Sequence, residues 1–408
     1  MKAMLLGAPN KVGLEEVENP TADDGNSVVR ITHSGVCGTD LKIFSGGIPA
    51  NYPLIMGHEM IGEVTQAGDS ASPKVGSRVI VDPVLYCGEC FHCNIGQTQL
   101  CPNGGLIGRD QDGGFAEYVA VPPKNVFAMP DKITNQEAPL IQVLTTVMHA
   151  QQMASVSIND TVVVLGLGVG GLLHVQLAKA RGAKTIIGIT RSKWKREVAE
   201  SIGADITLEP NDLTKQLVLE ATNGIGADLV IESAGKLSVL AQAMDLVRLG
   251  GRVLGYGIHT NTEGALPFYD MYFKEIQFIN ARAATDKDFS ACLEMFESGK
   301  INLNPLISDI LPLDQLGKAM EMVGTDAPQR MKIINRTEPR DSRNPTFFSV
   351  VVEIAWISKD KPITIMIKKK QQPSGAELII PKKPNNIKKN PIKAIKPRLS
   401  SLGFLTAI

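Results

Sequence analysis

The stretch Val162-Val163-Val164-Leu165-Gly166-Leu167-Gly168-Val169-Gly170-Gly171 decides the fold of this chain. Its β-branched first half predicts a strand, and the residues from Leu172 to Ala180 predict an amphipathic helix. Between them stands G-x-G-x-x-G, in which the first glycine permits a tight turn, the second lets backbone approach a pyrophosphate and the third packs helix against strand. Five residues are therefore candidates for binding a dinucleotide: Gly166, Gly168, Val169, Gly170 and Gly171. A glycine-rich turn without any ligand is the alternative.

Further strand and helix signals follow this motif, each bracketed by glycine. They are Thr185 to Ile189, Ser192 to Ile202, Asp228 to Ile231 and Gly251 to Gly255. Repeated strand-helix-strand units predict an α/β fold with a doubly wound parallel sheet. We place this nucleotide-binding domain at residues 151–285.

The residues before this domain show a different pattern of residue types. Residues 1–150 contain short Val/Ile-rich runs separated by Gly, Pro, Asn and Asp, which predict a β-rich domain with long functional loops. The strand signals are Ser27 to Thr32, Ile61 to Gln66, Arg78 to Val81 and Ala116 to Val121. After the nucleotide-binding domain, residues 286–338 carry two helix signals and a final short strand, Lys332 to Ile334.

Charge separates the last seventy residues from the rest of the chain. The chain of 408 residues holds 42 Lys and Arg against 42 Asp and Glu. Residues 340–408 carry 14 basic and 4 acidic side chains, so their charge is +10 and that of the remainder is −10. We interpret residues 339–408 as a basic extension that is disordered or foreign to the fold. An acidic body argues against nucleic-acid binding, which rests on basic side chains at phosphates.

The N-terminus and the longest uncharged stretches bear on location. Residues 1–6 are too short for the apolar region of a signal peptide, and polar residues interrupt both long uncharged stretches. We therefore expect a cytoplasmic protein that does not enter a membrane.

Four of the six cysteines form C-x2-C-x2-C-x7-C, at Cys87, Cys90, Cys93 and Cys101. Four thiolates satisfy tetrahedral Zn²⁺ and leave no open position, so this pattern predicts a structural metal site. An iron-sulfur cluster, a redox pair and cysteines packed as small apolar residues are the alternatives.

A second candidate metal site lies upstream, in Cys37-Gly38-Thr39-Asp40 and Gly57-His58-Glu59. The sulfur of Cys37, the imidazole of His58 and the carboxylate of Glu59 can hold Zn²⁺ with one position open for a substrate oxygen. Such an ion makes the deprotonation of an alcohol feasible near neutral pH. Thr39 is a candidate proton relay, and Asp40 a candidate for orienting His58. Alternatively, Cys37 is a buried small residue and His58 an ordinary loop histidine.

The end of the second strand of the nucleotide-binding domain bears on the choice of cofactor. An NAD-binding fold normally offers Asp or Glu there, but this chain reads Thr190-Arg191-Ser192-Lys193-Trp194-Lys195-Arg196. Thr190 and Ser192 do not repel a 2′-phosphate, and Arg191, with Lys193, Lys195 or Arg196, can attract one. This favours NADP over NAD, unless the segment is only a solvated helix start. Gly257, just after a later strand, is a further cofactor-binding candidate.

The motifs together resemble the zinc-dependent medium-chain dehydrogenases, a family that includes alcohol, polyol, threonine and sugar dehydrogenases. The resemblance runs from Met1 to about Asn335 and includes the stretches Ser34-Gly35-Val36-Cys37-Gly38-Thr39-Asp40, Gly57-His58-Glu59-Met60-Ile61-Gly62-Glu63-Val64 and Gly113-Gly114-Phe115-Ala116-Glu117-Tyr118. It implies a GroES-like catalytic domain, a Rossmann domain, a return of the chain to the first domain, and a homodimer or homotetramer. It also implies that Cys37, His58 and Glu59 bind a catalytic zinc.

Two positions depart from the family pattern. Many relatives place Glu, Asp or Cys where this chain has Gln142, and alcohol dehydrogenases often carry a relay histidine where it has Lys42. The resemblance implies hydride transfer between NAD(P) and a secondary alcohol such as a polyol, sugar, sugar acid or hydroxy-amino acid. A zinc-independent quinone or enone reductase is one alternative. A non-catalytic protein that binds through its basic extension is another.

Overall fold

A computed structural model describes residues 1–68, 73–260, 263–325, 329–337, 349–355 and 364–370. Most of the predicted basic extension, residues 339–408, lies outside these ranges. Its described parts are two strands, β19 (Ser349–Ala355) and β20 (Thr364–Lys370). β19 pairs antiparallel with β2 (Lys11–Glu16) and with β20.

The nucleotide-binding domain is built on a six-stranded parallel sheet. Its strand order is β13 (Ile206–Leu208), β12 (Thr185–Ile189), β11 (Thr161–Leu165), β14 (Ala227–Glu232), β15 (Val247–Gly255) and β16 (Gln277–Asn280). The order runs outward in both directions from β11, as the doubly wound prediction requires. Every neighbouring pair in it is parallel.

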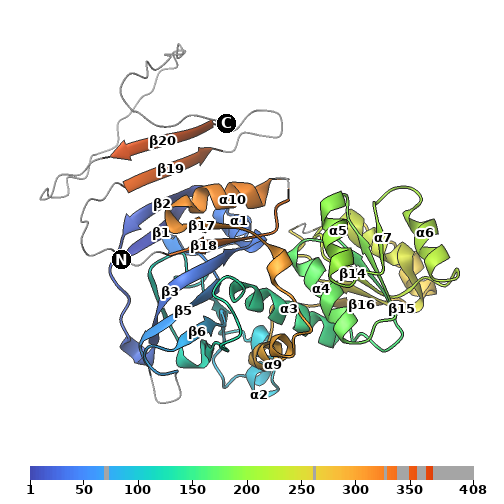
Figure 1. Cartoon of the computed structure of the whole chain (residues 1–408), viewed down its shortest axis with the longest axis horizontal. Helices are drawn as coiled ribbons and strands as arrows, with labels where there is room; N and C mark the ends of the chain where they lie inside the picture. The colour runs from blue at the N-terminus through green and yellow to red at the C-terminus, as the bar shows by residue number, and fades with distance from the viewer. Residues whose placement is uncertain (69–72, 261–262, 326–328, 338–348, 356–363, 371–408) are drawn as a thin grey trace, which may run out of the picture. The chain divides into compact units, whose positions relative to one another are not determined.

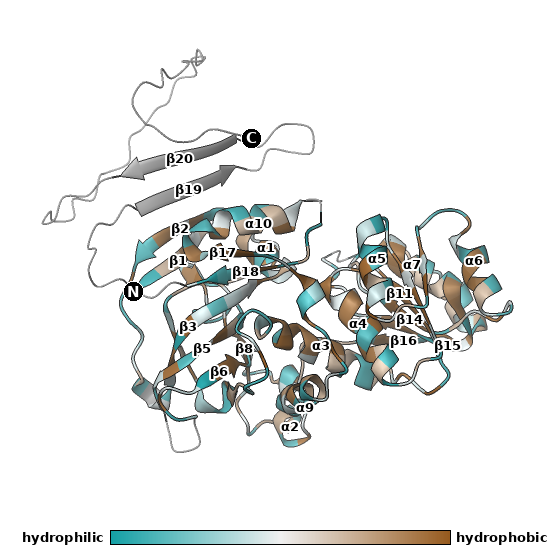
Figure 2. Ribbon diagram, in the orientation of Figure 1, coloured by the Kyte–Doolittle hydropathy of each residue, from teal (hydrophilic) through white to brown (hydrophobic). Residues whose placement is uncertain are grey.

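Helices connect these strands, and the sheet carries the buried core of the domain. They are α4 (Val169–Ala180), α5 (Lys193–Ser201), α6 (Thr214–Ala221), α7 (Leu237–Leu246) and α8 (Phe268–Phe273). Alternate residues of β11 enter two hydrophobic clusters: Val162 and Val164 lie in one, and Val163 and Leu165 in the other. Figure 2 shows apolar residues along β11 and β14, in the middle of the sheet. Burial on both faces explains the continuous apolar runs of the central strands.

The first domain contains a seven-stranded and a five-stranded sheet, and a short pair of β7 (Val84–Leu85) and β8 (Gly105–Leu106). The larger sheet has the order β10 (Val126–Ala128), β6 (Arg78–Val81), β5 (Glu59–Gln66), β3 (Ser27–Val36), β18 (Lys332–Arg336) and β17 (Ile307–Pro312), with β9 (Tyr118–Val121) also paired to β3. The smaller sheet has the order β20, β19, β2, β1 (Lys2–Ala8) and β4 (Leu54–Ile55).

The chain returns to the first domain at its C-terminal side. β18 pairs antiparallel with β3, so Ile333 lies opposite Val36, and Figure 1 shows the two strands side by side. Five helices complete this part: α1 (Gly38–Phe44), α2 (Phe91–Asn94), α3 (Pro139–Met153), α9 (Asp286–Glu297) and α10 (Leu316–Gly324). Short 3₁₀ turns cover Asp23–Gly25, Thr98–Leu100, Pro123–Asn125, Asn304–Leu306 and Leu313–Gln315. The domain boundary predicted after residue 150 falls inside α3. Among the helices of the described residues, none has the length and apolarity needed to cross a bilayer.

Candidate active site

Cys37 and His58 meet beside a buried carboxylate. Cys37 stands at the start of α1, and its backbone N–H donates to Asp40 Oδ2 at 2.8 Å. The other oxygen of Asp40 lies 3.1 Å from Nδ1 of His58, an ion-pair distance without hydrogen-bond alignment. Because Asp40 is fully buried, it fixes both the start of the helix and one edge of the imidazole. Nε2 of His58 is then the ring nitrogen left to serve as a ligand.

Glu59 joins this cluster and is paired with a lysine from the far end of the chain. One ligand atom each of Cys37, His58 and Glu59 lies within 4.8 Å of the others. Nζ of Lys332, on β18, lies 2.6 Å from Glu59 Oε1 and 2.7 Å from Oε2, and 3.3 Å from the carbonyl oxygen of Val36. Glu59 is fully buried and Lys332 is 4% exposed. The ammonium therefore offsets the negative charge of Glu59 inside the protein.

Charged neighbours raise the pKa values of His58 and Lys332. Burial alone would lower the pKa of His58, but the adjacent Asp40 carboxylate and then Cys37 raise it well above its usual value. Burial likewise works against the charge of Lys332, whereas Glu59 and Cys37 raise its pKa. A site that raises the pKa of a buried imidazole stabilises positive charge there, and a bound cation competes with the proton for the same ring.

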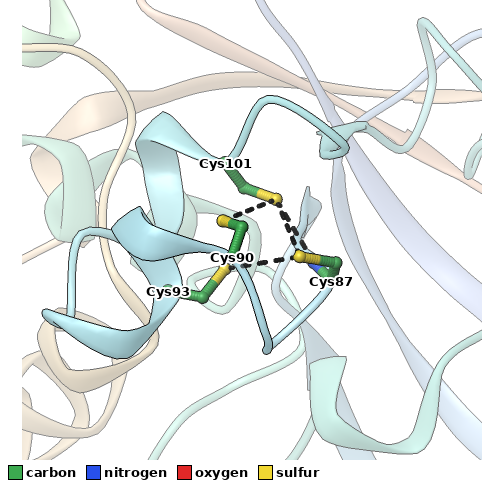
Figure 3. Close-up of side chains that lie close together, drawn as sticks. All are labelled: Cys87, Cys90, Cys93 and Cys101. Carbon is green, nitrogen blue, oxygen red and sulfur yellow. Dashed lines mark hydrogen bonds between the residues drawn. The ribbon is translucent and has the colours of Figure 1, made fainter.

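The four-cysteine segment converges as its spacing predicts. Sulfur-to-sulfur distances are 3.5 Å for Cys87 and Cys101, 3.8 Å for Cys90 and Cys101, and 4.0 Å for Cys87 and Cys93. Figure 3 shows all four side chains pointing toward one another. Four sulfurs at 2.3 Å from a tetrahedral zinc ion are separated by roughly 3.8 Å, so this donor set fits that ion. None of the four is in a disulfide. Backbone N–H groups of Glu89 and Cys90 lower the pKa of Cys87 to about 6, which favours the thiolate.

The glycine motif forms the turn between β11 and α4. Gly166 has a φ of 94°, in the region that side chains disfavour, and Gly168 immediately precedes the helix. A Cβ at Gly171 would lie 1.9 Å from the carbonyl oxygen of Gly166, so only glycine permits this close packing. Val169 and Gly170 form the first turn of α4. The backbone N–H groups at this helix start are the kind that bind a pyrophosphate.

The end of β12 carries the residues expected at the cofactor ribose. Thr190 follows the strand, and Ser192 caps α5, whose first turn contains Lys195. Arg196 Nη1 donates to the carbonyl oxygens of Thr190 and Arg191, at 2.7 and 3.0 Å. Its Nη2 lies 3.0 Å from Oε2 of Glu209. Arg196 thus holds the loop that contains Thr190 and Arg191 in place.

Two contacts join helices α1 and α3 to the cofactor domain. Lys42, on the helix that Cys37 starts, donates from Nζ to the carbonyl oxygen of Ile258 at 2.9 Å. Ile258 follows Gly257, whose N–H donates to the carbonyl oxygen of Glu232 at 2.9 Å. The hydroxyl oxygens of Thr146, on α3, and Tyr256 lie 2.8 Å apart.

The two other residues discussed from the sequence lie on helices of the same region. Thr39 is in the first turn of α1 and is half-buried, and Gln142 is 8% exposed on α3. The roles of Thr39 and Gln142 stay predictions.

Sequence reasoning missed two residues of this region. Lys332 was placed only in a final short strand, and nothing local indicates a partner 273 residues away. A lysine next to the apolar pair Ile333 and Ile334 is a weak local signal of burial. Tyr256 was not singled out, although it stands between two glycines at the end of a predicted strand.

Comparisons with known proteins agree with this arrangement. Residues 23–131 match the alcohol dehydrogenase GroES-like domain, and residues 168–298 match the zinc-binding dehydrogenase domain. The chain is 30% identical over 332 residues to D-arabitol-phosphate dehydrogenase of Enterococcus avium, covering 79% of this chain and 94% of that protein. It is 33% identical over 305 residues to L-threonine 3-dehydrogenase of Pyrococcus abyssi, covering 72% and 86%. A crystal structure of a zinc-binding dehydrogenase from Sinorhizobium meliloti bound to NADP matches with a TM-score of 0.77 and 30% identity, covering 82% of this chain and 98% of that one.

Proposed function

The chain belongs to the zinc-dependent medium-chain dehydrogenase family, and from this premise we propose that its active site is the cluster of Cys37, His58 and Glu59 facing the Rossmann domain. The protein is an oxidoreductase that transfers hydride between a secondary alcohol and NAD(P). The observation that carries the site assignment is the convergence of three metal-type ligand atoms at the start of α1, the helix whose Lys42 donates to Ile258 just after Gly257.

The donor chemistry of the cluster fits a catalytic zinc. A thiolate, an imidazole and a carboxylate are ligands that Zn²⁺ accepts with one position left open. When bound, zinc supplies a Lewis acid that polarises an alcohol oxygen. Cys37 and His58 would hold it directly. Glu59 shares its two oxygens with Lys332, so we propose that it contributes charge and at most one ligand atom.

The surrounding residues hold this donor set in place. Asp40 keeps the imidazole of His58 oriented, and the first turn of α1 keeps Cys37 beside it. We propose that Thr39, in that turn, passes the substrate proton toward solvent. The four cysteines from Cys87 to Cys101 would hold a second zinc that has no open position and stabilises their loop.

The substrate class follows from the surroundings of Lys42. Lys42 lies on α1, the helix that begins at Cys37; burial lowers the pKa of its ammonium and the charge of Cys37 raises it. An ammonium there can bind the hydroxyl, carboxylate or phosphate group of a substrate. We propose a polyol, sugar, sugar acid or hydroxy-amino acid as the substrate, supported by relatives that act on arabitol phosphate and threonine.

We further propose that NADP is preferred over NAD. The end of β12 offers Thr190 and Arg191 in place of a carboxylate, and Arg196 holds both of their carbonyl groups. An acidic residue there would repel a 2′-phosphate, whereas a guanidinium can bind one.

The protein is proposed to act as a homodimer or homotetramer in a reducing compartment such as the cytoplasm. All six cysteines are free, which supports the reducing compartment.

An exposed apolar surface on α8 supports the oligomer. Its four large side chains Phe268, Tyr269, Tyr272 and Phe273 are more than three-fifths exposed, and the neighbouring β16 is an edge strand. Light scattering on the purified protein tests the subunit number.

Replacing the proposed ligands tests the function. We expect Cys37→Ala and His58→Ala to lose at least a hundred-fold in turnover of a polyol and hydroxy-acid panel, and to lose about one zinc per chain. Cys292→Ala is the matched control, because Cys292 is buried on α9 outside both metal-type groups. Undiminished turnover in folded Cys37→Ala or His58→Ala would contradict the mechanism. A wild-type protein without zinc that reduces quinones or enones would favour the zinc-independent alternative.

A further inference from the structure

Tyr256 is held at three points where the two domains meet. Its hydroxyl oxygen lies 2.8 Å from that of Thr146, whose own hydroxyl donates to the carbonyl oxygen of Val143 at 2.8 Å. Because the hydrogen of Thr146 is used in that bond, Tyr256 is the donor to Thr146. The ring of Tyr256 also packs edge-on against His174, with centroids 4.5 Å apart and planes at 87°.

The third contact of Tyr256 is with Gly170, in the glycine turn between β11 and α4. A Cβ built on Gly170 would lie 2.6 Å from Cε1 of Tyr256 and 3.2 Å from its hydroxyl oxygen. Gly170 has an ordinary helical position in the first turn of α4, so backbone conformation does not require glycine there. The ring of Tyr256 is therefore the reason that this position has no side chain.

The charges of Cys37 and Glu59 affect the pKa of the Tyr256 phenol. Burial raises the pKa of Tyr256, and the negative charges of Cys37 and Glu59 raise it further, against the hydrogen bond to Thr146. The phenol therefore remains a neutral donor at working pH. Tyr256 also directly precedes Gly257, whose neighbour Ile258 accepts from Lys42.

From these contacts we propose that Tyr256 is a positioning residue for the nicotinamide end of the cofactor. Its ring fills the space beside Gly170, so a nicotinamide attached to a pyrophosphate at the glycine turn is directed toward Cys37 and His58 instead of settling against α4. Thr146 fixes the ring through the hydroxyl bond. The inference rests on the proposed dehydrogenase function and adds a residue that its metal and glycine motifs do not contain.

The test measures cofactor binding and turnover on the zinc-loaded full chain. Titration with NADPH and with NADH, followed by nicotinamide fluorescence, gives each Kd, and a deuterated alcohol gives the isotope effect on turnover. Loss of one hydrogen bond predicts a Kd raised about two- to ten-fold in Tyr256→Phe and in Thr146→Val. Both variants should also lower kcat and raise the isotope effect. The double variant should be no worse than either single one, because both remove the same bond.

A second experiment exchanges the sizes of the side chains at positions 170 and 256. Gly170→Ala places a methyl group against the ring, and we expect it to raise the cofactor Kd by at least ten-fold. Adding Tyr256→Leu, which removes the atoms that clash, should lower the Kd of Gly170→Ala to that of Tyr256→Leu alone. Tyr52→Phe is the matched control, because it likewise removes one tyrosine hydroxyl bond, from Tyr52 to the carbonyl oxygen of Ile43 within the first domain. We expect no change in Kd for this variant.

Two results would overturn the proposal while leaving the dehydrogenase function intact. One is a Tyr256→Phe protein with wild-type Kd, kcat and isotope effect. The other is a Gly170→Ala defect that Tyr256→Leu leaves unchanged. In the first case, a lower thermal midpoint would assign Tyr256 a purely structural role. Failure of the wild type to bind either cofactor would refute the function and this inference together.

Discussion

Replacing Lys332 with Met removes the counter-charge of Glu59 and nearly preserves the shape of the side chain. Both partners are buried, and the ammonium lies 2.6 and 2.7 Å from the two carboxylate oxygens. At an effective dielectric constant of about 20, two unit charges about 2.7 Å apart attract by about 6 kcal/mol. Part of this is offset by desolvation of the ions. Breaking a buried pair by removing one partner costs about 3 to 5 kcal/mol, because the remaining charge is left unpaired.

We therefore expect Lys332→Met to lower the free energy of unfolding of the metal-stripped protein by about 3 to 5 kcal/mol. The assay is urea unfolding followed by tryptophan fluorescence, with the midpoint compared at constant slope. In the zinc-loaded protein the loss should be smaller, since a dication beside Glu59 replaces the missing ammonium. The double variant Lys332→Met with Glu59→Gln should recover most of the loss.

Lys179→Met is the matched control for this measurement. Lys179 lies 3.0 Å from Asp205, but its side chain is 49% exposed and that of Asp205 is 36% exposed. Such a pair contributes about 0 to 1 kcal/mol. A Lys332→Met loss no larger than that of Lys179→Met would refute the reasoning. So would an equal loss with and without zinc.

Three further predictions concern other parts of the molecule. Burial raises the pKa of Asp82 to about 7 from its usual 3.8, so its protonated form stabilises the fold below pH 3.8 and this contribution is lost as the pH rises through about 7. The stability of Asp82→Asn relative to the wild type should therefore increase, on the order of a few kcal/mol, as the pH rises from about 4 to about 8. Thermal unfolding across this pH range measures the difference. A difference that does not change with pH would contradict the prediction. Cys101→Ser should lose one zinc and lower the thermal midpoint while largely preserving kcat; unchanged metal content argues against a structural site. Arg196→Leu should raise KM several-fold for NADPH and less for NADH in steady-state kinetics, because the loop carrying Thr190 loses its support, and an equal rise for both cofactors would contradict the assignment.

The sequence predicted the elements whose signals are local. β6 and β12 have the predicted limits, because each is a short apolar run bracketed by polar residues. The four cysteines and the glycine motif were predicted with their geometry, because short segments containing glycine fix the placement of ligands that are close in sequence.

The features that the sequence did not predict are contacts between distant segments. Lys332 reaches Glu59 only because β18 pairs with β3, and strand pairing over such a separation has no local signal. Tyr256 meets Thr146 only because the cofactor domain packs on α3. The predicted domain boundary after residue 150 lies in α3 for a related reason: helix α3 contributes to the same hydrophobic cluster as β11 and α4, so packing continues across it.

The pairing of β18 with β3 has a consequence for how the protein can be dissected. A fragment ending near residue 150 would retain Cys37, His58 and Glu59 but would lack the cation that accompanies Glu59 in the intact chain. Synthesis on the ribosome meets the same constraint, since the early ligands emerge long before residue 332 exists. The catalytic half is thus an incomplete folding unit until translation passes β18, and expression of the isolated N-terminal piece should yield a protein poorly able to assemble its metal centre.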